Sequence, residues 1–222
     1  MPLPGNVPSL GYLFRFVFGN LFFKKRLVAV YDRATYQTVS LDHSNFRIFR
    51  VNKYNYSTYR SFILDVTARR SLFLTRSAIE ENLTDPRYST FVAVEKSELQ
   101  PVGVSWALVT GDEVYWHDSF PIPPNSGFLL YSYVLPEYRR QGAYSEMLEA
   151  SYEYLFNTVG LEYAYGIFEA MNLNQLKAQQ YSEPKYGIKI DSVNYLIKLL
   201  GINLLSLYKN KQGTKVYFVL FR

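Results

Sequence analysis

The feature that most constrains the fold is an unbroken apolar run, Gly127 to Leu135, which stops at a proline and leads into a basic turn and a helix. Such a run is typical of a strand buried on both faces, and Pro136 ends it because proline has no backbone N–H for a sheet. The segment 143–156 predicts an amphipathic helix. Its core-facing side carries Met147, Leu148, Ser151 and Leu155. The sequence therefore predicts a strand, a basic turn and a helix that packs on the core.

Other apolar segments predict how the rest of the chain alternates between strands and helices. Strands are expected at 45–52, 91–95, 102–109, 113–118, 162–168, 185–190 and 215–221, and helices at 56–70, 77–83 and 172–181. Turn residues separate the strands between 91 and 118, as antiparallel hairpins require. Residues 193–208 are mostly apolar and fit either a helix or a covered loop. This order of elements indicates an α/β (α+β) fold.

The first 43 residues are predicted to form an extension, a helix plus an extended segment, ahead of a main domain at 44–222. The aromatic run from Leu10 to Phe23 predicts a helix that docks on the domain or lies at a membrane or partner surface. A transmembrane span needs about 20 apolar residues, and a secretory signal needs a basic start and a cleavage site. The run is short for a transmembrane span and lacks the basic start and the cleavage site, so neither a transmembrane helix nor a secretory signal is expected.

Cysteine content and charge exclude several classes of function. The chain has no cysteine, which rules out disulfides, a thiol nucleophile and thiolate metal sites. It has two histidines, His43 and His117, so no metal centre is expected, and it lacks the Gly-x-Ser-x-Gly elbow of many hydrolases. The net charge of +5 favours a phosphorylated cofactor, nucleic acid or an anionic membrane as partner. Nucleic acid is the least favoured because the basic residues do not gather on one motif.

The turn between the apolar run and the helix suits an anion. It reads Arg139-Arg140-Gln141-Gly142-Ala143-Tyr144. A helix start presents unpaired backbone N–H groups and the positive end of the helix dipole, which can hold a pyrophosphate. Gly142 permits close approach of the backbone, and the two arginines add charge-assisted hydrogen bonds. The turn is therefore predicted to bind a phosphorylated ligand.

This turn resembles the acyl-coenzyme A (acyl-CoA) signature of the GNAT superfamily of acyltransferases: Gln or Arg, two variable residues, Gly, one variable residue, then Gly or Ala. Tyr144 departs from it, so its side chain must point away from the cofactor or cover it. The preceding Val134-Leu135-Pro136 matches the Val-x-Pro strand end of the family. The resemblance spans roughly 46–190 and implies a mixed, mostly antiparallel sheet of six to seven strands flanked by helices. It also implies binding of acetyl-CoA or another acyl-CoA by Tyr133, Val134, Leu135, Arg139, Arg140, Gln141, Gly142, Ala143, Tyr144 and Ser145.

A second segment resembles a later motif of the same family. Asn174 and Tyr181 lie seven residues apart on one predicted helix, and Gly187 follows. The resemblance implies that Asn174 contacts the pantetheine arm and that Tyr181 protonates the departing thiolate, which a phenol with a pKa near 10 can do. The segment departs from the usual motif in that the spacing from Tyr181 to Gly187 is longer and contains Pro184.

The mechanism that the resemblance implies is direct attack of an acceptor amine on the thioester. Backbone N–H groups near Tyr133 to Leu135 polarise the carbonyl oxygen, and no covalent enzyme intermediate forms. The amine must lose a proton, so a base is expected. The first candidate is Glu169, and His117 or Asp118 is the second.

The acceptor stays open at this stage: an amino sugar, an amino acid or peptide, a small amine or a protein N-terminus. A small amino sugar or amine is favoured, because the basic, aromatic N-terminal segment is similar to GNAT members linked to bacterial surface polysaccharides. An acyl group longer than acetyl is also compatible. The expected location is cytoplasmic, or peripheral to the inner face of a membrane through residues 10–26, and a homodimer is one option. The alternatives are a non-catalytic binding module and a long-chain acyltransferase at a membrane.

Overall fold

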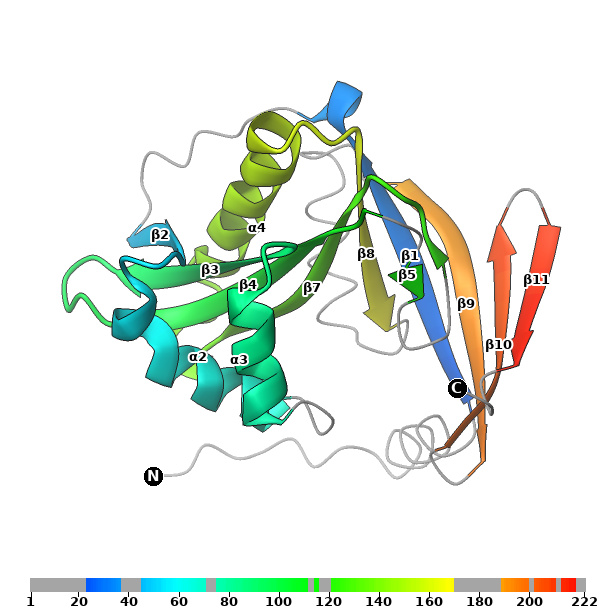
Figure 1. Cartoon of the computed structure of the whole chain (residues 1–222), viewed down its shortest axis with the longest axis horizontal. Helices are drawn as coiled ribbons and strands as arrows, with labels where there is room; N and C mark the ends of the chain where they lie inside the picture. The colour runs from blue at the N-terminus through cyan, green and yellow to red at the C-terminus, as the bar shows by residue number, and fades with distance from the viewer. Residues whose placement is uncertain are drawn as a thin grey trace.

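The computed structural model describes residues 23–36, 45–70, 75–111, 114–115, 121–169, 189–199, 202–210 and 213–218 (Figure 1). The helices are α2 (Tyr56–Arg70), α3 (Arg76–Thr84) and α4 (Ala143–Glu153). The strands are β1 (Phe23–Asp32), β2 (Phe46–Arg50), β3 (Tyr88–Glu95), β4 (Pro101–Val109), β5 (Val114–Tyr115), β6 (Pro121–Ile122), β7 (Gly127–Val134), β8 (Tyr163–Glu169), β9 (Lys189–Leu199), β10 (Ile202–Asn210) and β11 (Gly213–Phe218).

The strands form a nine-stranded sheet in the order β11-β10-β9-β1-β8-β7-β4-β3-β2, and β5 and β6 form a separate two-stranded sheet. Within the larger sheet β7 and β8 are parallel, and the other described neighbours are antiparallel. The expected fold, a mixed and mostly antiparallel sheet flanked by helices, is confirmed. The sheet is wider than the expected six to seven strands because β1 joins its centre and β10 extends its edge.

Strand β1 lies between β8 and β9, although it comes first among the described strands. Val28 pairs with Ile167 of β8 on one side and with Ser192 of β9 on the other. Val28 and Ala29 are fully buried, as expected of a strand with neighbours on both edges. Residues 23–32, which the sequence analysis placed in an N-terminal extension, therefore belong to the same sheet as the rest of the chain.

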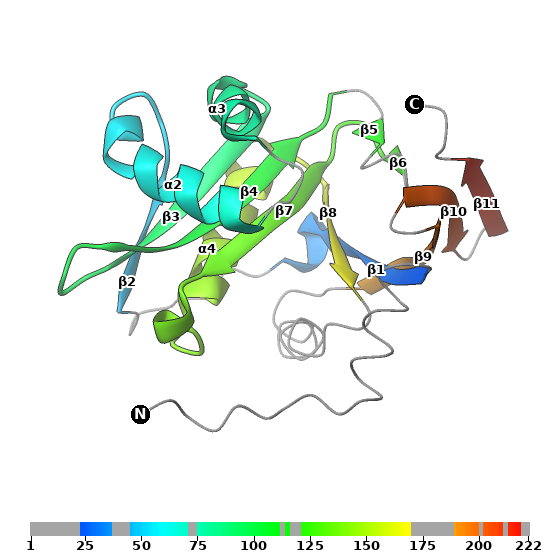
Figure 2. The same cartoon turned by 90° about the horizontal axis from the view of Figure 1, so that it is seen from below.

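Helices lie on both faces of the part of the sheet that β2, β3, β4 and β7 form (Figure 1, Figure 2). Helices α2 and α3 lie on one face, where Ile63 and Ile79 pack with Trp106 of β4. Helix α4 lies on the other face, where Leu148 and Tyr152 pack with residues of β1, β3, β4, β7 and β8. The predicted core side of α4 is confirmed. Met147, Leu148, Ser151 and Leu155 are all buried.

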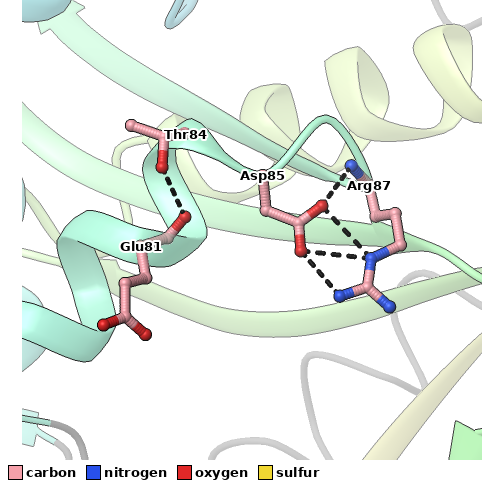
Figure 3. A network of polar contacts seen from close by, with 4 residues as sticks. All are labelled: Glu81, Thr84, Asp85 and Arg87. Carbon is pink, nitrogen blue, oxygen red and sulfur yellow. Dashed lines mark hydrogen bonds and ion pairs between the residues drawn. The ribbon is translucent and has the colours of Figure 1, made fainter.

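A short network closes α3 and starts β3 (Figure 3). The Thr84 hydroxyl donates to the carbonyl of Glu81 at 2.9 Å, which satisfies a carbonyl in the last turn of the helix. The Asp85 carboxylate accepts from the backbone N–H of Arg87 at 2.9 Å and from its guanidinium Nη2 at 2.7 Å. Pro86 follows the helix directly, in keeping with the predicted stop. The chain thus turns from helix to strand within three residues.

Two predictions of secondary structure are wrong. Residues 193–199 lie in β9 and 202–208 in β10, and not in a helix or covered loop, because each strand has antiparallel neighbours in the sheet. The run 113–118 does not extend the β3–β4 hairpin, because β5 pairs with β6 in the small sheet. The expected helices at 10–23 and 172–181 lie outside the described residues. No helix of the described part is long and apolar enough to cross a membrane.

Candidate functional site

Strands β7 and β8 pair only at one end and then separate (Figure 1, Figure 2). Their parallel register runs from Gly127 opposite Ala164 to Leu129 opposite Gly166. From Leu130 onwards β7 keeps β4 as its neighbour but has lost β8. The prediction that the whole run is buried on both faces is therefore wrong: Gly127 to Leu129 are buried, whereas Ser132 is exposed.

A β-bulge lies where the two strands separate. Ser105 and Ala107 of β4 face Ser132 and Leu129 of β7, so Leu130 and Tyr131 together oppose Trp106. Both bulge residues pack against the cluster that contains Trp106, on the α2 and α3 face. A bulge bends the strand and redirects its backbone groups, and bulges are common beside functional sites.

Beyond the bulge, the backbone groups of β7 alternate between β4 and the side that β8 has left. The Leu135 N–H donates to the Val102 carbonyl of β4 at 2.8 Å, so it is not available to a ligand. The Val134 carbonyl instead accepts Arg139 Nε at 3.1 Å. By alternation, the N–H groups of Val134 and Ser132 point towards the open side of the strand. This corrects the sequence expectation, which included the N–H of Leu135 among the polarising donors.

The basic turn connects β7 to α4 and contains two residues with a left-handed backbone conformation. Arg140 has φ 65° and Gly142, the N-cap of α4, has φ 99°. A Cβ on Gly142 would meet a single atom within 4 Å, Oε1 of Glu146, at 3.7 Å, so the space above the glycine is open. The amide N–H groups of Gly142, Ala143, Tyr144 and Ser145 have no hydrogen-bond acceptor among the described residues. Unpaired N–H groups at a helix start are the donors by which such a position can hold an anion.

Side chains of the turn make contacts with β7 and with other residues of the turn. The Arg139 guanidinium lies 5.5 Å from the centre of the Tyr133 ring, in addition to its bond to Val134. Gln141 Nε2 donates to the carbonyl of Glu137 at 2.8 Å. Both arginines are exposed, and Arg139 in addition fixes the turn to β7.

Tyr144 does not fill the turn. Its ring packs against the core clusters on the α4 face, beside residues such as Leu148 and Met147. Desolvation by this burial raises the pKa of its phenol to about 12. The partly buried side chain at which the sequence departs from the family signature thus packs against the core, away from the turn.

Two glycines set the distance between α4 and the sheet. A Cβ on Gly103 of β4 would lie 2.9 Å from Met147 Cε and 3.0 Å from the Tyr133 carbonyl oxygen. A Cβ on Gly127 of β7 would lie 2.7 Å from Leu155 Cδ1. Helix α4 therefore approaches β4, and the π-helical turn Tyr154–Thr158 after it approaches β7, as closely as they do only because these positions carry no side chain.

The structure brings together part of the predicted site. Tyr133 to Leu135 and Arg139 to Ser145 form one continuous strand, turn and helix start. Glu169 is the last residue of β8, as predicted, and pairs with Arg26 of β1. Tyr181, Asn174, His117 and Asp118 lie outside the described residues. Sequence reasoning missed the bulge, which left no signal, and Ser132, whose only signal was a hydroxyl within an apolar run.

Metal ligation finds no support in the described ranges. Within them, no group of three or more His, Asp or Glu side chains is close enough together to hold an ion. The described chemistry of this region is therefore that of backbone N–H groups, hydroxyls and arginines.

The sequence model of the acetyltransferase (GNAT) family matches residues 55–180, more than half of the chain. Among curated proteins, no sequence matches. A structure of the aminoglycoside N-acetyltransferase AAC(6')-Iy in complex with CoA is 21% identical over 64% of this chain and 90% of that chain, with a TM-score of 0.48. A functionally unknown conserved protein from Staphylococcus epidermidis ATCC 12228 is 16% identical over 88% of this chain and 68% of that chain, with a TM-score of 0.51. A Drosophila protein is 14% identical over 86% of this chain and 58% of that chain, with a TM-score of 0.54. The last two support the fold.

Proposed function

Because the chain belongs to the acetyltransferase (GNAT) family, we propose that it is an acyl-CoA-dependent N-acyltransferase acting on a primary amine of a small acceptor. The observation that carries the proposal is the start of α4. Its N–H groups from Gly142 to Ser145 have no acceptor in the described part of the chain, and they follow directly on a strand whose outer edge is open. A ligand with a diphosphate at one end and amides along its length fits both features.

The residues of the turn fit coenzyme A. Main-chain N–H groups of Gly142, Ala143, Tyr144 and Ser145 would hold the diphosphate, and Arg140 would add positive charge from the solvent side. Arg139 would act chiefly by holding the turn against β7, through its bond to Val134. Gln141 would fix the turn internally. Tyr144 would contribute its N–H while its ring stays in the core.

The open edge of β7 suits the arm of the cofactor. Backbone groups of Ser132 and Val134 point towards this edge, so an extended chain with amides can bind there as an added strand. When bound, acyl-CoA supplies the thioester acyl group. The Val134 N–H is the first candidate to polarise the carbonyl oxygen, since the Leu135 N–H is bonded to Val102. Tyr133 would flank the arm through its stacked position under Arg139.

The proton-transfer roles are proposed from the resemblance. Tyr181 would give a proton to the departing thiolate, and Asn174 would bind the pantetheine arm. Glu169, at the end of β8, would accept the proton of the amine, with His117 or Asp118 as the alternative. The position of Glu169 supports its candidacy, because β8 is the strand that diverges from β7.

The acceptor that we favour is a small amino sugar or amine. The support is the similarity of the basic, aromatic N-terminal segment to family members linked to surface polysaccharides. The proposed location is cytoplasmic or at the inner face of a membrane, with residues 10–26 as the contact, and a homodimer is the proposed assembly. A non-catalytic binding module and a long-chain acyltransferase at a membrane are the competing functions.

Mass spectrometry of acyl transfer tests the proposal. The full chain is incubated with acyl-CoA donors of different chain length and a mixture of amino sugars, amino acids and small amines. We expect a product that carries the mass of the acyl group, and loss of that product in Gly142→Glu, whose side chain would occupy the anion site. Binding of CoA without any turnover would favour the binding module. Turnover with long-chain donors alone would favour the membrane enzyme, and normal turnover by Gly142→Glu would refute the proposed turn.

A further inference from the structure

Ser132 is exposed although it lies in a strand near the middle of the nine-stranded sheet. Its neighbours along β7 are partly buried or buried, so it is the one exposed residue of this strand. The reason is the loss of β8 after Leu129, which leaves the outer edge of β7 uncovered at Ser132. A hydroxyl at this point lies within the edge where the proposed function places the arm of CoA.

The Ser132 side chain lies on the same face of the sheet as α4. It is paired in register with Ser105 of β4 and bonded to the hydroxyl of that residue. Ser105 shares its face of β4 with Gly103, two residues away, and Gly103 approaches Met147 of α4. Ser132 and the anion site at the start of α4 are therefore on one side of the sheet, joined by the strand end and the turn.

The two serines form a directed pair. Ser132 Oγ donates to Ser105 Oγ at 3.1 Å, and Ser105 is 1% exposed. Because the Ser132 hydroxyl donates its proton to the buried partner, its exposed oxygen keeps the lone pairs of an acceptor. Donation also polarises the Ser132 oxygen and makes it a stronger acceptor.

We propose that Ser132 accepts a hydrogen bond from an amide N–H of the pantetheine arm, with Ser105 fixing the orientation of its hydroxyl. This inference rests on the proposed function and adds a side-chain contact to the backbone contacts of β7. Ser132 is then a substrate-binding residue, and Ser105 a positioning residue that acts through it.

Calorimetric titration of the full chain with two ligands tests the proposal. One ligand is CoA and the other is 3′-phospho-ADP, which keeps the diphosphate but lacks the pantetheine arm. We expect Ser132→Ala to weaken CoA binding about fivefold, the effect of one neutral hydrogen bond, and to leave 3′-phospho-ADP binding unchanged. Ser132→Thr keeps the hydroxyl and should restore CoA binding, and Ser105→Ala should produce part of the loss.

The outcomes separate this inference from the function on which it rests. Equal CoA affinity in Ser132→Ala and the unsubstituted chain would overturn the role of Ser132 while leaving the acyltransferase proposal intact. Equal weakening of both ligands would also overturn it, since a disturbed turn and not a lost arm contact would then be responsible. If the unsubstituted chain bound neither ligand, the proposed function itself would fall, and the role of Ser132 with it.

Discussion

The hydroxyl of Tyr36 donates a 2.6 Å hydrogen bond to Oε1 of Glu149, a buried residue in the middle of α4. The Tyr36 ring also lies 5.3 Å from that of Phe156 and 6.0 Å from that of Tyr152. A short 3-10 turn, Arg33–Thr35, follows β1, and Tyr36 comes directly after that turn. The end of β1 is therefore fastened to the helix whose first turn forms the candidate anion site.

Replacing Tyr36 with Phe keeps the ring contacts and removes the donor to Glu149. We expect the free energy of unfolding to fall by about 1–2 kcal/mol, because a buried carboxyl oxygen loses its hydrogen bond. Urea denaturation measures the change. Tyr54→Phe is the matched control: Tyr54 is 84% exposed, and its loss of a hydroxyl should leave stability unchanged. Equal stability of Tyr36→Phe and the unsubstituted chain would show that the bond contributes nothing.

Gly142→Ala should weaken CoA binding at least tenfold. Alanine disfavours the φ of 99° by about 1 kcal/mol, and relief of that strain would turn the N–H groups away from the diphosphate. Gly160→Ala is a matched control in the turn that follows Tyr154–Thr158, with φ 87° and no atom of the described residues within 4 Å of the added Cβ. We expect a similar loss of stability in both variants but weaker CoA binding only in Gly142→Ala. Equal CoA affinities would contradict the role of the turn.

Gly103→Ala should destabilise the chain by about 1–3 kcal/mol through overpacking. The added Cβ meets the flexible end of Met147, which can move, and the backbone oxygen of Tyr133 at 3.0 Å, which cannot do so without shifting β7. Thermal and urea unfolding measure the loss. Gly111→Ala adds its Cβ where no atom lies within 4 Å, and its stability should stay close to that of the unsubstituted chain.

Stability should depend on pH through Asp85. Hydrogen bonds from Arg87, with their ion pair, hold the pKa of this carboxyl below its ordinary value. A lowered folded-state pKa means that the stabilising contribution is present above the unfolded pKa of about 4 and is lost as the pH falls through the folded value. Asp85→Asn should therefore cost up to about 1 kcal/mol near neutral pH, as expected of a partly exposed pair.

Urea denaturation of Asp85→Asn at a series of pH values checks this. The difference from the unsubstituted chain should shrink as the pH is lowered below about 4, where the unfolded carboxyl is protonated. Arg87→Gln removes the other partner and should show the same trend. A difference that stayed constant down to the acid end of the series would contradict the assignment.

Tyr181→Phe tests the proposed acid. If the phenol protonates the thiolate, kcat should fall about a hundredfold, at the lower end of the range for general acid catalysis, while the affinity for CoA changes little. Steady-state kinetics and calorimetry with CoA give the two quantities. A fall in affinity with an unchanged kcat would instead assign Tyr181 to binding or packing.

The sequence correctly predicts those elements whose apolar pattern fits only one type of secondary structure. The segment 56–70 is a helix and 102–109 is a strand because spacing and stop signals agree, and α4 buries the predicted side chains. The prediction for 193–208 is wrong because an apolar run alone does not show whether another strand of the fold is available to pair with it. Its pairing with β1 depends on residues far away in the chain.

In the candidate site, too, some features follow from the local sequence and others only from the tertiary structure. The turn from Arg139 to Tyr144 could be predicted because arginines followed by a glycine before a helix have a local physical meaning, and the structure gives Gly142 the left-handed φ that glycine favours. The direction of Tyr144 and the exposure of Ser132 could not be predicted. The exposure of Ser132 depends on where β8 leaves β7, and the direction of Tyr144 depends on the core clusters against which α4 packs.

The central place of β1 has a consequence for how the chain is made. Val28 pairs with Ile167 and Ser192, so a growing polypeptide exposes β1 until β8 and β9 have been translated. Pairings so distant along the chain are slow to form, and a waiting strand is prone to join the wrong partner. Chaperones that cover β1 during synthesis should therefore raise the yield of native protein more than chaperones that act after synthesis is complete.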